Sequence, residues 1–299
     1  MSTSIEAGIP APAALERCLD MDALERALPG LQARFPSAHP YPHVVVDALL
    51  RPGLAEAAGA AFPGPEAPLW THYRHVNEDK LGSPRRAQYP QAVEDVVAAL
   101  QTPAFVSWLS RLTGIPGLFP DPELEGAGMH RSGPGGFLHV HTDFQRHHHH
   151  PSWRRTVNLI LFLNPGWDPA WGGAIELWTP DMQHCGRTVP PRANHAVIFR
   201  SDDRSFHGHP EPLRCPPERA RKSLALYYYT DFDGPLAHEY SRFAPRPGDG
   251  RLQRAAMRVD NDLVRAFSAL KRRGAATDAG ASRILRRLGR WLRGGPTGR

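Results

Sequence analysis

The 299-residue sequence contains little cysteine. Its three cysteines, Cys18, Cys185 and Cys215, lie far apart in the chain and form no CxxC pair. An odd and unclustered set argues against both a disulfide framework and a thiolate zinc site. We therefore expect all three to be reduced thiols that contribute to packing.

Long apolar runs are also missing. The densest apolar stretch, Leu159–Leu163, is far shorter than the roughly 18–20 residues that a membrane-spanning helix needs. The first twelve residues have neither the basic nor the apolar region of a signal peptide, so we expect a cytoplasmic protein. With 41% hydrophobic and 22% charged residues, the composition is that of an ordinary globular protein and excludes a mainly disordered chain.

The excess of positive charge is confined to the C-terminal part of the chain. Residues 251–299 carry 13 basic and 3 acidic side chains, a net charge of +10. The other residues carry 23 basic and 27 acidic side chains, a net charge of −4 within the total of +6. Because the basic character belongs to the tail and not to the main body, we expect no DNA or RNA partner.

The first 125 residues have mainly helical patterns. Leucine spacing predicts an N-terminal helical extension over residues 1–40, with its helix ending at Pro29-Gly30. His43–Asp47 is β-branched and predicts a short strand. Thr102-Pro103 is typical of a helix start, with threonine as the N-cap and proline at the first helical position.

From about residue 126 the pattern changes to short β-rich runs separated by glycine, proline and aspartate. The predicted strands are 136–143, 155–163, 174–178, 195–199 and 222–230. Several short strands after a helical block predict an α+β protein with an antiparallel β-sandwich or jelly roll. Beyond residue 245 the sequence becomes helical and basic, so residues 246–299 form a predicted basic helical tail.

Two histidines and one aspartate are candidate metal ligands. His141 and Asp143 are two residues apart on a predicted strand, so both side chains point to the same face. About one His-x-Asp is expected by chance among 16 histidines, and the tripeptide is therefore weak evidence alone. His207 follows the strand 195–199 and is the best candidate for a third ligand from a distant strand.

Two imidazoles and one carboxylate on one face of a metal ion leave coordination positions open. This ligand set is typical of non-haem Fe(II) oxygenases, in which the open positions accept a 2-oxo acid and O₂. A dicarboxylic co-substrate also needs a cation at its far end, and Arg221 on the last predicted strand can supply it. Ser223 lies two residues further on the same face.

Five ordered segments resemble one family. They are Gly135–Asp143, Arg155–Asn164, Gly172–Trp178, His207-Gly208 and Arg221–Tyr227. Their order and spacing over about residues 126–230 resemble the Fe(II)/2-oxoglutarate-dependent dioxygenases, specifically the prolyl 4-hydroxylase-like branch. The resemblance implies a double-stranded β-helix, or jelly roll, with helices packed on its outside, and a dioxygenase domain over residues 41–245.

The resemblance also assigns roles to individual residues. It implies that His141, Asp143 and His207 bind the iron, and that Arg221 binds the distal (C5) carboxylate of 2-oxoglutarate. Ser223 matches the serine of an Arg-x-Ser pattern found elsewhere in the superfamily. The sequence departs from the family at Phe162, because many relatives have a tyrosine whose hydroxyl shares that carboxylate. Ser223 or a water molecule is the expected substitute.

The implied activity is hydroxylation of an unactivated C–H bond. Fe(II) is bound, 2-oxoglutarate and O₂ are consumed, and succinate and CO₂ are released. Ascorbate is an expected stimulant. Related halogenases have a small residue where Asp143 stands, so an intact carboxylate favours hydroxylation. The substrate is peptidyl or free proline by analogy alone, and a free amino acid, a glycan or another metabolite would use the same site. The alternative is a non-catalytic, cupin-like jelly roll that binds a metal and a small ligand.

Other histidines and arginines have less specific patterns. His139 is a rival ligand, but we expect it to be a wall or core residue, and we expect His209 to lie behind the site or at the surface. His147–His150 is predicted to form a loop at the barrel mouth. A cluster of Arg146, Arg154 and Arg155 near that mouth favours a negatively charged substrate.

The extreme C-terminus contains a second candidate function. Within Ser282–Arg293, leucine, isoleucine and tryptophan fall on one helical face and arginines on the other. Such a basic amphipathic helix can bind an acidic partner or a membrane surface, or it can dock on its own domain. A protein whose activity lies in this tail is a third hypothesis. The sequence predicts no oligomeric state.

Overall fold

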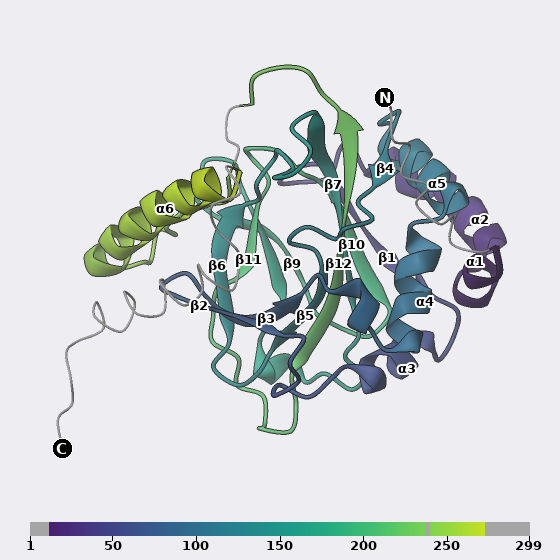
Figure 1. Cartoon of the computed structure of the whole chain (residues 1–299), viewed down its shortest axis with the longest axis horizontal. Helices are drawn as coiled ribbons and strands as arrows, with labels where there is room; N and C mark the ends of the chain where they lie inside the picture. Colours follow the sequence, from purple (N-terminus) through teal and green to yellow (C-terminus); the bar gives the residue numbers. More distant parts are fainter. Residues whose placement is uncertain (1–11, 237–239, 273–299) are drawn as a thin grey trace.

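The computed structural model describes residues 12–236 and 240–272. Its centre is a curved antiparallel sheet that nearly closes into a barrel, with helices α1–α5 covering one side and α6 lying against the other (Figure 1). No helix among these residues is long and apolar enough to cross a membrane. All three cysteines are unpaired, as the sequence predicts.

The helices are α1 (Pro12–Cys18), α2 (Met21–Arg34), α3 (Leu54–Ala61), α4 (Gln91–Leu100), α5 (Pro103–Thr113) and α6 (Arg251–Arg272), with 3-10 turns at Arg86–Gln88 and Pro169–Trp171. The strands are β1 (His43–Asp47), β2 (Thr71–Arg74), β3 (Glu78–Ser83), β4 (Phe119–Pro120), β5 (Gly128–Ser132), β6 (Phe137–Thr142), β7 (Trp153–Phe162), β8 (Ile175–Trp178), β9 (Cys185–Val189), β10 (His195–Arg200), β11 (Phe206–His209), β12 (Arg221–Asp231) and β13 (Arg242–Phe243).

The strand order confirms the predicted jelly roll. Neighbouring strands pair in the order β1-β10-β7-β12-β5-β3-β6-β11-β8-β9, with β13 on β6, β2 on β3 and β4 on β12. Every pairing is antiparallel, and most neighbours in space are distant in sequence, as in a jelly roll built from long crossovers; β2–β3 and β8–β9 are the consecutive pairs. The sheet folds over so that β6 and β11 face β7 and β12 across the interior (Figure 1).

Alternation along β7 and β12 separates two cores. Leu159 and Leu161 are fully buried on the outer face, where they pack with α2, α4 and α5 in the largest apolar cluster. Phe162 points inward and packs with Ile175 and Phe199 between the two layers of the barrel. Side chains of successive strand residues point to opposite faces, which explains why one strand serves both cores. The helices therefore support the outside of the sheet that carries the site on its inside.

The helix predictions are mostly confirmed, with one error. The Thr102 side chain accepts a hydrogen bond from the Phe105 amide at the start of α5, and α5 ends at Gly114, whose φ of 68° is the left-handed conformation that glycine adopts without strain. The prediction that Pro29-Gly30 ends the first helix is wrong, because α2 continues to Arg34. Leu28 and Leu31 are buried on either side of this pair, and their burial outweighs the local cost of proline.

The hairpin of β2 and β3 was not predicted from the sequence. This part of the chain was predicted to be helical, yet β3 inserts between β5 and β6 in the centre of the sheet. The reason is the composition of β3, whose inward-facing residues include Glu78 and Lys80 in place of apolar side chains. A strand with charged residues on its interior face lacks the apolar alternation by which strands are recognised.

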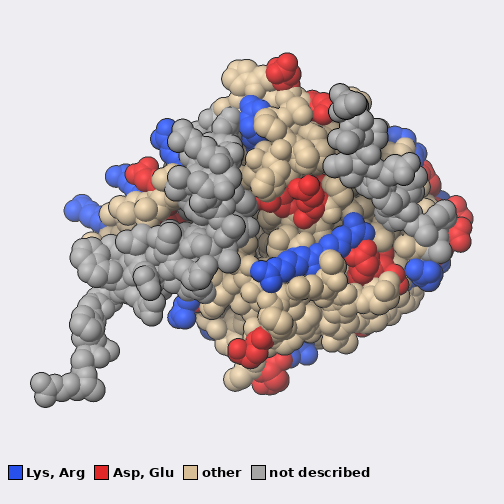
Figure 2. Space-filling model, viewed as in Figure 1, with Lys and Arg blue, Asp and Glu red and all other residues tan. Residues whose placement is uncertain are grey.

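Helix α6 packs against the barrel and lies in the first half of the predicted basic tail. The Asn261 side chain bonds both backbone groups of Phe243, accepting from its N–H at 2.9 Å and donating to its carbonyl at 2.8 Å. Met257 is 1% exposed. The predicted amphipathic segment Ser282–Arg293 lies outside the described residues. Basic and acidic side chains of the described residues are interspersed on the face drawn in Figure 2, and neither forms a broad patch there.

Buried charges attach α6 to the β2–β3 hairpin. His75 lies between two carboxylates, with Nε2 2.7 Å from Glu78 Oε1 and Nδ1 3.0 Å from Asp260 Oδ2 on α6. Burial alone would lower the pKa of His75, but the hydrogen bonds to Asp260 and Glu78 outweigh it and raise that pKa to about 10. His75 is therefore an imidazolium at neutral pH, and it joins the hairpin to the helix.

We expect His75→Phe to destabilise the fold by about 3–5 kcal/mol at pH 6, because it leaves Asp260 buried without this cation and Glu78 with Lys80 alone. The raised pKa means that the stabilisation is complete below the unfolded value of 6.5 and is lost as the pH rises toward 10. Urea unfolding of both proteins between pH 6 and 10 should show a shrinking difference. His72→Phe, at a half-exposed pair with Asp79, should cost at most about 1 kcal/mol. A difference that does not change with pH would contradict the expectation.

Candidate metal site and adjoining pocket

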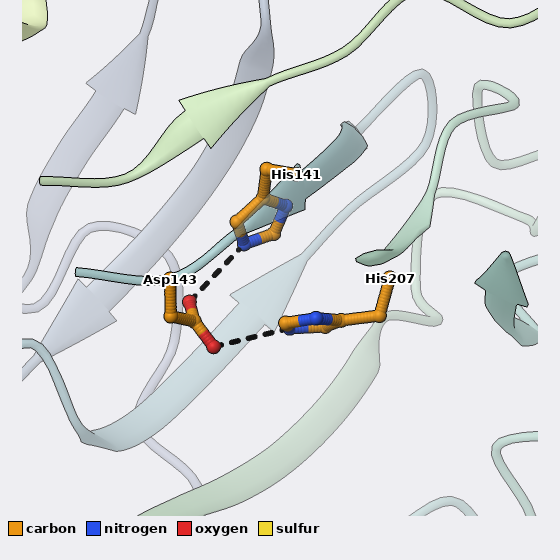
Figure 3. Close-up of side chains that lie close together, drawn as sticks. All are labelled: His141, Asp143 and His207. Carbon is orange, nitrogen blue, oxygen red and sulfur yellow. Dashed lines mark ion pairs between the residues drawn. The ribbon is translucent and has the colours of Figure 1, made fainter. Parts of the chain in front are cut away.

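Three buried side chains meet inside the barrel. His141 is on β6, Asp143 follows the end of that strand, and His207 is on β11. The Nε2 atoms of His141 and His207 lie 3.3 and 3.4 Å from the two carboxylate oxygens of Asp143 (Figure 3). One ligand atom from each residue lies within 4.8 Å of the others, and no other group of three or more potential ligands in the described ranges does so. The structure thus brings together the three ligands predicted from the sequence.

A β-bulge aligns the two histidines. His207 pairs directly with His141, whereas His209 pairs with Leu138, so two residues of β6 are opposite the single residue Gly208 of β11. Because of the bulge, His141 and Leu138 both face the interior although they are three residues apart. His139 lies on the other face, with Nε2 3.4 Å from Gln253 of α6, and is a wall residue as expected.

Backbone carbonyls hold both imidazoles in one tautomer. The Nδ1–H of His141 donates to the carbonyl of His139 at 2.9 Å, and that of His207 donates to the carbonyl of Ser205 at 3.0 Å. With the proton assigned to Nδ1, the Nε2 lone pairs point toward Asp143 and are available to a metal. Burial lowers the pKa of His207 to about 4, so its ring is neutral at physiological pH.

Asp143 is oriented by two side chains of β7. Its Oδ2 accepts hydrogen bonds from Arg155 Nη2 and Asn158 Nδ2, both at 2.7 Å. Arg155 Nε also donates to Asn158 Oδ1 at 2.7 Å, which closes the network. Burial would raise the pKa of Asp143, but the Arg155 charge and the two histidines hold it well below its usual value. Oδ1 receives neither of these β7 donors and faces His141.

Arg155 was expected in a cluster at the barrel mouth, and the structure places it elsewhere. It is 1% exposed, and its guanidinium lies over the Tyr227 ring, 3.1 Å from the centroid. Arg154 instead lies over the Phe232 ring, and Arg146 donates to the carbonyl of Gly234. The three arginines therefore have different environments, and Arg155 belongs to the metal site. Its Nη1 is buried with no hydrogen-bond partner among the described residues.

The pocket beside the three ligands contains the predicted Arg221 and Ser223. Arg221 is 6% exposed, its Nε donates to the carbonyl of Gly173 at 2.7 Å, and its guanidinium lies 4.9 Å from the centre of the Phe162 ring. No carboxylate of the described residues pairs with it, and burial lowers its pKa to about 9. A buried guanidinium needs an anionic or polar partner, so the pocket fits a carboxylate.

Three further pocket residues were not predicted from the sequence. Lys80 of β3 and His130 and Ser132 of β5 line the same pocket as Arg221. His209 also lines it and is fully buried, so it lies behind the site as expected. His147–His150 forms a loop, in which His147 and His148 approach Asp121 and Glu125 and not the metal ligands. The pairing of the strands was the missing signal, since it is the order β12-β5-β3 that brings Lys80, His130 and Ser132 to the pocket of Arg221.

One family model matches the part of the chain that contains the candidate site. Residues 127–229 match the family model described as the 2OG-Fe(II) oxygenase superfamily. This segment begins just before β5 and ends two residues before the end of β12. It includes all three candidate ligands, Arg221 and Ser223. The barrel core is therefore similar to 2OG-Fe(II) oxygenases, as the resemblance implies. The sequence matches none of the curated proteins with which it was compared.

Solved structures resemble this chain at low sequence identity. A prolyl hydroxylase from Trichoplax adhaerens, in complex with a hypoxia inducible factor peptide fragment, is 14% identical with a TM-score of 0.52, over 70% of this chain and 91% of that one. A Pseudomonas putida prolyl-4-hydroxylase is 20% identical with a TM-score of 0.47, over 68% and 100% of the two chains. HygX from Streptomyces hygroscopicus, with nickel, 2-oxoglutarate and hygromycin B bound, is 12% identical with a TM-score of 0.38, over 63% and 82%.

Because of the bulge, there is no room for a side chain at Gly208. A Cβ there would lie 2.7 Å from the carbonyl oxygen of Leu138 and 2.9 Å from that of His139. We expect Gly208→Ala to force β11 away from β6, to separate His207 from His141, and to cost about 1–3 kcal/mol in chemical unfolding. Gly133→Ala is the matched control, because a Cβ there meets nothing within 4 Å. Equal stability of the two variants would show that β11 is free to shift.

Proposed function

We propose that this protein is an Fe(II)- and 2-oxoglutarate-dependent dioxygenase that hydroxylates an unactivated C–H bond and releases succinate and CO₂. The observation that carries the proposal is one buried pocket holding a His-Asp-His cluster and, beside it, a guanidinium with no carboxylate partner among residues 12–236 and 240–272. A metal site alone would also suit a binding protein. The unpaired Arg221 is what a dicarboxylic co-substrate requires.

The donor set fits iron. Two neutral imidazole nitrogens and one carboxylate oxygen, converging from one side, match the ligand preference of Fe(II) and leave positions for other ligands. His141, Asp143 and His207 would hold the metal. Bound Fe(II) supplies the redox chemistry with O₂ and 2-oxoglutarate. The burial of the three residues, each under 10% exposed, keeps bulk water from the reacting groups.

Arg155 and Asn158 act as positioning residues. Both donate to the same oxygen of Asp143, so the carboxylate is fixed with its other oxygen toward His141 and the metal position. Such support of a ligating carboxylate orients it before the metal binds. The carboxylate of Asp143 itself favours hydroxylation over halogenation.

The co-substrate pocket is formed by polar groups on β12. Arg221 would pair with the distal carboxylate of 2-oxoglutarate through its Nη atoms, since Nε is occupied by the Gly173 carbonyl. Ser223 lies opposite Phe162 in the β12–β7 register, so its hydroxyl is close to the position where many relatives carry a tyrosine. We propose that Ser223 also binds this carboxylate.

The acceptor of the hydroxyl group is proposed to be peptidyl or a small molecule. The similar prolyl hydroxylase from Trichoplax adhaerens, which holds a peptide fragment, supports a peptidyl acceptor. We assign the catalytic domain to residues 41–245, because β1 pairs into the same sheet as the metal ligands. The three unpaired cysteines support a reducing compartment, the cytoplasm.

Anaerobic titration of the Fe(II)-loaded protein with 2-oxoglutarate tests the proposed function. We expect the weak visible charge-transfer band of an iron-bound 2-oxo acid in the wild type and its loss in His207→Ala. Arg221→Ala should need on the order of 10- to 100-fold more 2-oxoglutarate, because a charge-assisted pair is lost. Arg219→Ala is the matched control, since this arginine lies outside the pocket and donates to the carbonyl of Gly166.

A wild-type protein that holds iron and gives no band would rule out the oxygenase. The jelly roll would then be a binding module of the cupin kind. If the band forms and Arg221→Ala titrates like the wild type, the co-substrate does not use Arg221, and the assignment of the pocket is wrong.

The positioning role of Asn158 makes a separate prediction. Asn158→Ala should weaken Mn(II) binding, measured by calorimetry, by about 10- to 100-fold, because Asp143 loses one of its two orienting donors. Thr156→Ala on the same strand is the control, since that hydroxyl bonds the Arg154 carbonyl and Thr230 and does not reach Asp143. Unchanged Mn(II) affinity in Asn158→Ala would show that Arg155 alone suffices.

A further inference from the structure

Three polar residues form a row across adjacent strands of the pocket. Arg221 on β12 pairs directly with Ser132 on β5. Leu81 of β3 pairs with Arg131 of β5, and continuing this antiparallel register by one residue places Lys80 opposite Ser132. Arg221, Ser132 and Lys80 therefore follow one another across the sheet.

All three side chains point into the same pocket. Residues directly opposite each other in a sheet share a face, and Arg221, Ser132 and Lys80 all line the cavity beside the metal ligands. Adjacent strands are about 4.8 Å apart, so the Cα atoms of Arg221 and Lys80 are separated by roughly 10 Å with Ser132 between them. Both long side chains can reach one carboxylate placed above Ser132.

The neighbouring row on the same face of the sheet, two residues along each strand, offers a carboxylate no further cation. This row crosses four strands, and each residue in it is the direct partner of the next: Phe162 on β7, Ser223 on β12, His130 on β5 and Gly82 on β3. Phe162 has no hydroxyl to offer a carboxylate. Burial, followed by the charge of Lys80, lowers the pKa of His130 to about 3, so this ring is neutral. Lys80 is thus the cation closest in register to Arg221.

Lys80 is held in place by the hairpin network. Its side chain is 14% exposed, and Nζ lies 3.1 Å from Glu78 Oε2 and 5.8 Å from the centre of the Tyr73 ring. Glu78 also binds the His75 imidazolium, which Asp260 of α6 anchors. Because Glu78 is shared between two cations, it does not fully neutralise Lys80.

We propose that Lys80 binds the distal carboxylate of 2-oxoglutarate together with Arg221, with Ser132 lying between them. This inference rests on the proposed function and adds a residue outside the segment that matches the family model. Two cations at the far end of the pocket select 2-oxo acids that carry a second carboxylate. In this chain Lys80 adds a second cation to a carboxylate site in which Ser223 lies opposite Phe162, a residue without a hydroxyl.

Calorimetry on the Mn(II)-loaded protein tests the proposal with two ligands. 2-Oxoglutarate carries the distal carboxylate, and 2-oxopentanoate has the same carbon chain without it. We expect Lys80→Met and Lys80→Gln to weaken 2-oxoglutarate binding by on the order of 10- to 100-fold and to change 2-oxopentanoate binding less than about twofold. Lys222→Met is the matched control, because Lys222 neighbours Arg221 but its Nζ donates outward to the Gly59 carbonyl.

Two results would overturn the role of Lys80. One is unchanged 2-oxoglutarate affinity in both Lys80 variants, and the other is an equal loss for the two ligands. Failure of the proposed function looks different, because the wild-type protein itself would then bind neither 2-oxo acid. A loss confined to 2-oxoglutarate in both variants, with Lys222→Met like the wild type, supports the proposal.

Discussion

The pairing of β6 with β11 is the constraint on which the site depends. His141 and His207 are 66 residues apart in the sequence and come together because they are direct partners across these strands, with ring centres 4.6 Å apart. The bulge opposite Gly208 sets which residues of β6 face the interior. A shift of the register by one residue would turn every side chain of the strand to the other face, so the metal site and the barrel form or fail together.

A second β-bulge, on β7, brings together the two side chains that hydrogen-bond Asp143. On β7, Tyr228 pairs with Val157 and Tyr229 with Arg155, so Thr156 is the extra residue. Arg155 and Asn158 are three residues apart and would lie on opposite faces of a regular strand, yet both bond Asp143. Burying a charge is costly unless it is paired, and the two bulges let the fold place cation and carboxylate together. Arg221 is buried without a carboxylate partner among the described residues, which marks the pocket as the place for a ligand anion.

These irregularities also explain how far the sequence could be interpreted. Short β-rich runs separated by glycine, proline and aspartate predicted the apolar strands. The family resemblance implied His141, Asp143, His207, Arg221 and Ser223, which the structure gathers around one cavity. Period-two reasoning cannot place Arg155 beside Asp143, because the bulge at Thr156 leaves no mark in the pattern. The β2–β3 hairpin was missed because its inward residues are charged. Pro29 was a misleading helix stop, because burial of its neighbours outweighed the local penalty.

The parts that the sequence did not predict belong to one physical system. Lys80 is in the pocket because β3 inserts between β5 and β6, and β3 can carry Glu78 and Lys80 inward only because each charge has a partner. That chain of partners continues through His75 to Asp260 on α6. The same helix bonds Phe243, whose ring lies 5.2 Å from that of His141. Charged residues on an interior strand can be buried only when the residues that neutralise them are held in place. Helix α6 and the β2–β3 hairpin are therefore needed to form the pocket.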